Sequence, residues 1–338
     1  MRKNIRGLAQ SLFSIVFIII VIGSYVIVAQ DVITGEWKSD NWSSKKEQDG
    51  KIHLSFERRN EHGKHQHGSS FAYSDLQGLT REQEQNGKVA FRLVREAGTV
   101  ECEGTFVNGK GSGTFRFTPD TNYIYAMRSR GFDFEKSSSK NSDPGRAENR
   151  LLSAALINVT TALADDLKSV NLGPLDVDDL FKAAIFKVDS KFMAEMKASG
   201  FPGLKMEDLV KARIFKIDAD FVRKVREMGF VEKDFEQMVK FSIFKVTPEF
   251  LAELKNAGFN NLSSEDVVKF RIFKVTPELL TDLKAEGFSN LTAEEVVKFR
   301  IFKIDREFIR NAKAADPNIT VEELVRMKIG VHRIKSSN

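Results

Sequence analysis

Ile243-Phe244-Lys245-Val246 is one of five closely similar tetrapeptides in a chain of 338 residues. The copies begin at positions 185, 214, 243, 272 and 301, so each starts 29 residues after the previous one. A strict period of this length is typical of a stacked repeat array rather than of a conventional enzyme core. The period therefore predicts the fold of more than half of the chain, and it favours a binding function.

One full repeat unit, residues 247–275, is expected to form two short helices. Thr247 is predicted to cap the first helix, and a proline follows at the first helical position. Gly258 is predicted to end that helix in the left-handed conformation. Ser263 or Ser264 then caps the second helix. A helix of about ten residues is marginal alone, so stacked units are needed to bury a continuous core.

We therefore expect an α+β protein, in which a small antiparallel β-domain precedes an α-solenoid of 29-residue two-helix repeats. Residues 33–118 are assigned to the β-domain, which could be a sandwich or a partly closed barrel. Residues 119–159 are a degenerate first repeat with a flexible inserted loop at 133–147. Residues 160–335 form the repeat array.

Alternating apolar residues in the β-domain predict a meander of about six half-buried strands. Residues 99–107 place Val100 and Cys102 on one face of a strand. Asn108-Gly109 follows directly and predicts a tight hairpin, because both turn positions need positive φ. Cys102, the only cysteine, is interpreted as a small buried apolar residue, and its covalent pairing with another chain is the alternative.

Residues 1–29 resemble an export signal, with a basic start and an apolar run that ends at Ala29. The run is nearly long enough to span a membrane, so residues 8–29 could instead be an uncleaved anchor. Both interpretations place the rest of the chain outside the cytoplasm, in the periplasm or at the extracytoplasmic face of the inner membrane. The net charge of +5 is too small to indicate nucleic-acid binding.

Three histidines lie close together in the β-domain, namely His62, His65 and His67. Their imidazoles could gather around a transition metal. A polar hairpin loop is the alternative, since asparagine, glycine and serine surround them. The segment lacks the His-Glu-x-x-His arrangement of zinc peptidases.

Basic residues recur at fixed positions of the repeat and predict a basic surface along the array. A first lysine row consists of Lys182, Lys211, Lys240, Lys269 and Lys298, and a second lysine row consists of Lys187, Lys216, Lys245, Lys274 and Lys303. Arg213, Arg271 and Arg300 lie nearby. Bases near the end of each second helix would also complement its dipole. The alternative is a binding surface for an anionic partner, which would release the protein at high salt.

The apolar residues of the tetrapeptide are expected to build the stack. The recurring phenylalanines, Phe186, Phe215, Phe244, Phe273 and Phe302, are interpreted as core, with an aromatic ligand track as the alternative. In this interpretation the isoleucine and the valine are also buried, and only the lysine points towards a function.

Two stretches of the β-domain, residues 97–106 and 111–119, are followed by repeated Val-Thr-Pro-Glu units. Together they resemble the extracytoplasmic extensions of some bacterial membrane zinc peptidases of the antibiotic-sensor type. This resemblance implies a bacterial envelope module for binding or sensing. The chain lacks the peptidase domain and zinc motif of those proteins, so no catalytic residue is carried over.

The sequence thus predicts an exported, noncatalytic protein that binds a protein or an anionic envelope polymer and needs no cofactor. No Ser/His/Asp grouping supports catalysis. A metal-binding protein that uses His62, His65 and His67 is one alternative, and an envelope hydrolase without a recognisable motif is another.

Overall fold

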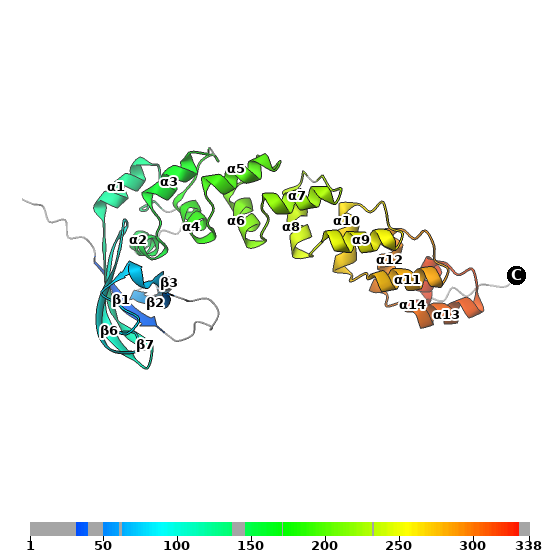
Figure 1. The fold of residues 1–338 in the computed structure, drawn as a ribbon, viewed down its shortest axis with the longest axis horizontal. Coiled ribbons are helices and arrows are strands. Elements are labelled where there is room, and N and C mark those ends of the chain that lie inside the picture. Colours follow the sequence, from blue (N-terminus) through cyan, green and yellow to red (C-terminus); the bar gives the residue numbers. More distant parts are fainter. Residues whose placement is uncertain are drawn as a thin grey trace, which may run out of the picture.

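The computed structural model describes residues 32–39, 50–60, 63–136, 146–170, 172–231 and 233–330. Within them, a curled antiparallel sheet is followed by a long row of helices, so the protein is α+β (Figure 1). The predicted export segment lies outside the described residues. No helix of the described part is long and apolar enough to cross a membrane.

The sheet has seven strands in the order β3-β2-β1-β7-β6-β5-β4, and all neighbours are antiparallel. The strands are β1 (Ile33–Ser39), β2 (Lys51–Asn60), β3 (Gly63–Ala72), β4 (Leu76–Gln77), β5 (Asn86–Arg95), β6 (Gly98–Val107) and β7 (Lys110–Pro119). The structure therefore has one more strand than predicted. Of the two predicted architectures it has the partial barrel, because the strands form a single curled sheet rather than two packed sheets.

Fourteen helices follow in the described part, and they alternate between two positions along the row (Figure 1). The first helices are α1 (Thr121–Ser129), α3 (Thr161–Lys168), α5 (Ser190–Ala198), α7 (Ala219–Glu227), α9 (Pro248–Asn256), α11 (Pro277–Ala285) and α13 (Arg306–Ala315). The second helices are α2 (Arg146–Ile157), α4 (Val177–Phe186), α6 (Met206–Ile214), α8 (Phe235–Ile243), α10 (Ser264–Ile272), α12 (Ala293–Ile301) and α14 (Val321–Lys328).

Glycines allow the sheet to curl around a buried tryptophan. Gly104 of β6 lies opposite Gly113 of β7, and a Cβ atom on Gly113 would lie 1.9 Å from the Glu103 carbonyl oxygen. Trp37 is fully buried beside them, and its Nε1 donates to that same carbonyl oxygen at 3.1 Å. The β6–β7 hairpin confirms the Asn-Gly prediction, since Asn108 has φ 51° and Gly109 has φ 76°.

The sheet is joined directly to the first helix pair. α2 packs against β3, β6 and β7, and the Ser153 hydroxyl lies 2.7 Å from His67 Nε2. The buried Tyr123 hydroxyl of α1 donates to the Val159 carbonyl oxygen at 3.0 Å. Glu96, in the β5–β6 turn, accepts a bond from the backbone N–H of Thr161 at the start of α3.

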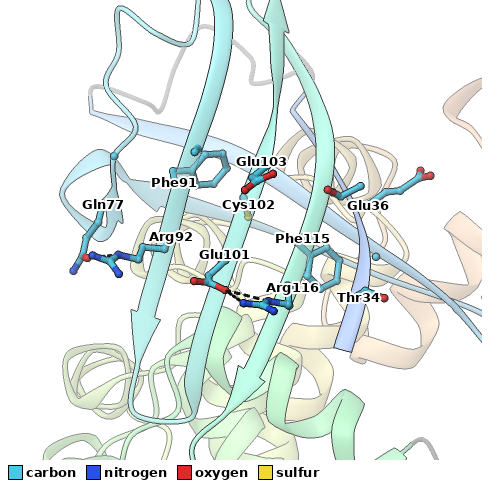
Figure 2. A pocket seen from close by; sticks show the side chains of 14 residues that line it. Thr34, Glu36, Gln77, Phe91, Arg92, Glu101, Cys102, Glu103, Phe115 and Arg116 are labelled. Carbon is cyan, nitrogen blue, oxygen red and sulfur yellow. Dashed lines mark hydrogen bonds and ion pairs between the residues drawn. The ribbon is translucent and has the colours of Figure 1, made fainter. Parts of the chain in front are cut away.

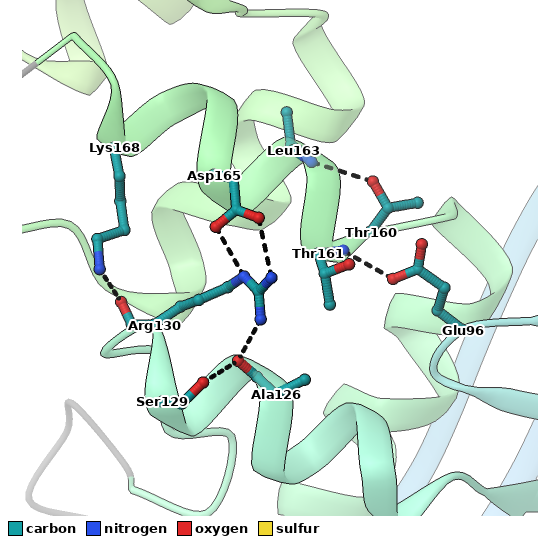
Figure 3. A network of polar contacts seen from close by, with 9 residues as sticks. All are labelled: Glu96, Ala126, Ser129, Arg130, Thr160, Thr161, Leu163, Asp165 and Lys168. Atoms are coloured by element: carbon teal, nitrogen blue, oxygen red, sulfur yellow. Dashed lines mark hydrogen bonds and ion pairs between the residues drawn. The ribbon is translucent and has the colours of Figure 1, made fainter.

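A polar network also connects α1 to α3 (Figure 3). Arg130 binds both carboxylate oxygens of Asp165, at 2.7 Å and 2.9 Å, and this bond lowers the pKa of Asp165. The Lys168 ammonium donates to the Arg130 carbonyl oxygen, which lies beyond the end of α1. The β-domain therefore continues into the helical row without a free linker.

The predicted helix ends are present. Thr247 caps α9 with its side chain, and Ser263, rather than Ser264, caps α10 through a capping box. Glycine follows the first helices with φ between 85° and 101° at Gly200, Gly229, Gly258 and Gly287. Each next phenylalanine stacks on a second helix, as in the Phe259–Phe270 pair with centroids 5.5 Å apart. These glycine caps confirm the prediction from the sequence.

The close approach of β6 and β7 predicts that Gly113→Ala destabilises the β-domain. An added methyl group must displace the Glu103 carbonyl, and overpacking of this kind costs about 1–3 kcal/mol. The free energy of unfolding of the two proteins can be measured by chemical denaturation. The exposed neighbour Thr114 provides the control, because Thr114→Ala should change stability by less than about 0.5 kcal/mol. Equal stability of G113A and the parent would contradict this account of the curl.

Candidate binding surface on the second helices

The second helices form a continuous series, and this series carries the side chains predicted to bind a partner. α4 contacts α6, α6 contacts α8, and the contacts continue through α10, α12 and α14. Residues 29 apart therefore occupy corresponding places on neighbouring helices. Rows of like side chains in the sequence become rows in space.

The tetrapeptide ends each second helix with a left-handed residue. In α8 the N–H of Val246 donates to the Phe241 carbonyl oxygen at 2.9 Å, and the N–H of Lys245 donates to the Ser242 carbonyl oxygen at 3.2 Å. These two bonds form a Schellman motif, in which the residue that donates the inner bond, here Lys245, is left-handed. After α4, α6, α8, α10 and α12 that residue is a lysine of the second lysine row, with φ between 50° and 55°.

The isoleucines of the tetrapeptide are exposed, which corrects the prediction that they build the stack. Their exposed fractions run from 44% at Ile272 to 53% at Ile185. This isoleucine row consists of Ile185, Ile214, Ile243, Ile272 and Ile301. The following valine or isoleucine, such as Val246, is buried instead. The physical reason is that the cap folds the residue after the lysine back onto the helix, as in the bond from Val246 to Phe241, and leaves the isoleucine at the helix end uncovered.

The recurring phenylalanines are only partly buried. Phe186, Phe215, Phe244, Phe273 and Phe302 pack against the core while part of each ring stays accessible. They thus lie between the two interpretations from the sequence, because they support the stack and also add apolar surface beside the isoleucine row.

Three of the five lysines in the first lysine row form ion pairs with a neighbouring second helix. Lys182 Nζ lies 2.7 Å from Glu207 of α6, Lys211 pairs with Glu236 of α8, and Lys298 pairs with Glu322 of α14. The bond with Glu207 raises the pKa of Lys182, and the same bond lowers the pKa of Glu207. Lys240 and Lys269 form no ion pair in the described part. This row therefore serves chiefly to connect successive second helices.

Arg213 and Arg271 stack on the first helix of their own pair, and Arg271 also reaches the preceding pair. The Arg213 guanidinium lies 3.7 Å from the Phe192 ring centroid. Arg271 stacks on Phe250 at 3.9 Å and donates to the Lys245 carbonyl oxygen at 2.7 Å.

The same bond to the preceding second helix recurs in neighbouring units. Arg300 donates to the Phe273 carbonyl oxygen at 3.2 Å. In α8 the corresponding residue is Ser242, which bonds the Phe215 carbonyl oxygen instead. These side chains satisfy carbonyl groups that would otherwise lack a partner at a helix end.

The side chains of the second lysine row make no structural contact, unlike Arg271 and the paired lysines of the first row. All five lysines are exposed, and none of their ammonium groups forms a hydrogen bond or ion pair within the described residues. Each lies two positions after an isoleucine of the isoleucine row. The sequence identified the lysines but missed this apolar row. No local signal identified it, because an isoleucine looks the same in the sequence whether it lies in the core or on the surface.

The β-domain carries an open hollow of about 1020 Å³ on the polar face of the sheet (Figure 2). Both arginines of its lining are bonded to neighbouring strands: Arg116 binds Glu101 at 3.0 Å, and Arg92 binds the neutral Gln77 at 3.0 Å. Cys102 is only 2% exposed, and burial raises the pKa of its thiol. The thiol is therefore a buried apolar group, as expected, rather than a nucleophile at this hollow.

The histidine segment forms a strand rather than a loop. His65 and His67 lie on β3, and burial lowers the pKa of His67, with a further contribution from His65. His62 lies outside the described residues. Within them, no group of three histidine, cysteine or acidic side chains could hold a metal ion. The predicted three-histidine site thus stays a prediction.

A comparison with protein-family models, curated proteins and solved structures finds no match for this chain. The candidate surface is therefore argued from its own geometry.

The left-handed lysines predict that Lys274→Gly stabilises the helical part. Lys274 has φ 52°, and a left-handed conformation costs an L-residue about 1–2 kcal/mol, which glycine avoids. The greater chain entropy of glycine offsets part of this gain, so an increase of up to about 1 kcal/mol is expected. Denaturant unfolding measures it, with Glu253→Gly inside α9 as the destabilising control. A loss of stability in K274G would contradict the proposed strain.

The contacts of Arg271 predict that Arg271→Ala weakens its own helix pair, through the loss of stacking on Phe250, and the contact with the preceding pair, through the loss of the bond to Lys245. The variant loses a cation–π contact of about 0.5–1 kcal/mol and a hydrogen bond of similar strength. Arg271→Lys should recover only part of the loss, because lysine lacks the planar guanidinium. Thermal unfolding followed by circular dichroism compares both with the exposed control Lys255→Ala. If R271A unfolds like the control, the arginine does not join the helix pairs.

Proposed function

We propose that this protein is an exported, noncatalytic binding or scaffold module of the bacterial cell envelope. In this proposal the helical part is an α-solenoid of 29-residue two-helix repeats, and its second helices carry the binding surface. The partner is a protein or an anionic polymer at the extracytoplasmic face of the inner membrane or in the periplasm.

The observation that carries the proposal is the isoleucine row beside the unpaired second lysine row. A single exposed apolar residue is common on protein surfaces, but contiguous exposed apolar patches mark interaction sites. Here the same exposed pair recurs on α4, α6, α8, α10 and α12. An elongated stack presents such rows as an extended surface, which is how repeat proteins bind their partners.

The contacts that other basic side chains make within the protein support this choice of binding surface. Arg271 and Lys182 are both engaged by neighbouring helix pairs, whereas the second lysine row has no such role. The charge of the second lysine row is therefore available to a partner, and it lies beside the isoleucine row.

This proposal predicts that a photoreactive amino acid at Ile243 or Ile272 crosslinks one discrete partner in intact cells. The same group at Glu253 of α9 or Thr281 of α11, both exposed on first helices, should give no such product. Crosslinked species are compared by gel mobility and mass spectrometry after isolation of the envelope fraction. Identical products from both sets of positions, or no product from the isoleucine positions, would overturn the proposal.

A further inference from the structure

The isoleucine row and the second lysine row define not only where a partner binds but also what shape it has. From their spacing and charge we infer that the surface binds an extended polypeptide in polyproline II conformation, with an apolar residue at every third position and acidic residues between. This inference rests on the proposed function and specifies its partner.

The first argument is the conformation of the lysines. The chain ends its first helices with glycine, such as Gly258 at φ 101°, but ends five second helices with lysine at φ 50–55°. Lysine is not a residue that the left-handed conformation favours. A strained residue type that recurs at one place indicates that its side chain has a function there. We infer that the function of these lysines is to place a positive charge at each cap.

The second argument is the charge around the two rows. After each tetrapeptide the next first helix is capped by Asp189, Asp218 or Asp305 towards the ends of the array, but by Thr247 and Thr276 in its middle. Lys245 and Lys274 thus lie two residues before an uncharged cap. Glu249 and Glu278 lie in the first turns that follow, but within the described residues neither forms an ion pair with Lys245 or Lys274. Both ammonium groups therefore remain available to an acidic partner beside Ile243 and Ile272.

The third argument concerns one end of the row, where the position that corresponds to the exposed isoleucines is buried within the protein. α2 ends with the same left-handed cap, in which Asn158 has φ 62° and the Val159 N–H bonds the Ala154 carbonyl oxygen. Leu156 holds the isoleucine position there, and it is 4% exposed on a helix that packs against the sheet. The isoleucine row therefore begins at α4, because the corresponding position of α2 is buried beside the β-domain.

The fourth argument is the spacing. Successive second helices contact one another, and helices in direct contact lie about 8–10 Å apart, so we expect successive isoleucines at about this spacing. A polyproline II helix has three residues per turn and rises about 9 Å in one turn, which brings every third side chain to the same edge. Residues on one face of a β-strand are only about 7 Å apart. The partly exposed phenylalanines also suit this partner, since polyproline II ligands bind aromatic-lined surfaces.

The test uses the full chain and fluorescence anisotropy with a labelled (Leu-Glu-Pro)6 peptide. This probe should bind, and its affinity should fall as salt rises. A peptide of the same composition in scrambled order should bind at least about tenfold more weakly, and (Leu-Lys-Pro)6 should not bind. A heptad helical peptide of leucine and glutamate serves as the competing geometry.

Two double variants separate the apolar from the charged contribution. Ile243→Ser with Ile272→Ser should weaken binding of the probe at least about tenfold, because two apolar contacts are lost. Lys245→Asn with Lys274→Asn should weaken binding and flatten its salt dependence. Asparagine is the matched choice, because Asn158 already takes this conformation in α2. Circular dichroism confirms that both variants remain folded.

Several outcomes overturn the inference. These are equal binding of the scrambled or heptad peptide, unchanged binding by both double variants, binding of anionic lipid vesicles in place of the peptide, or a dimer that I243S/I272S abolishes. If the probe fails but Ile243 still crosslinks a partner in cells, the extended-peptide inference falls and the proposed function stands. If neither occurs, both fall.

Discussion

The left-handed cap at the end of each second helix is the constraint on which the helical part depends. The bond from the Val246 N–H to the Phe241 carbonyl oxygen reverses the chain and directs it into the next first helix. The same cap recurs from Asn158 to Lys303, so successive units leave their second helices through the same backbone conformation. A regular departure brings the second helices into contact in series, and equivalent residues then form rows.

These rows divide the polar side chains into two kinds. Arginines stack on phenylalanines of their own helix pair and bond carbonyls at the end of the preceding second helix, and three lysines of the first row pair with glutamates of the next second helix. The carbonyl bonds and ion pairs connect neighbouring units, although each exposed ion pair adds little stability. The second lysine row has no comparable role. Its charge and the exposed isoleucines are left for interactions outside the chain.

The sequence predicted much of the fold because local rules decide helix ends and hairpins. Thr247, Gly258 and Asn108-Gly109 each specify a backbone conformation through a single residue type. The candidate site was harder to predict. The period revealed both lysine rows, but it did not show which lysines form ion pairs. Lys182 is paired because a glutamate of the next second helix lies opposite it, and the packing of neighbouring units decides where that glutamate lies.

The sequence by itself determined the period, the helix caps, the alternating strands and the buried Cys102, because these features depend on residues close together in the chain. Only the tertiary structure decided that β1 pairs with β7, that Ile243 is exposed while Val246 is buried, and that Arg271 reaches back to Lys245. An isoleucine before a helix cap has the same hydrophobicity in the core and on the surface. Its burial is fixed by the direction in which the cap turns the chain and by the helices that pack around it.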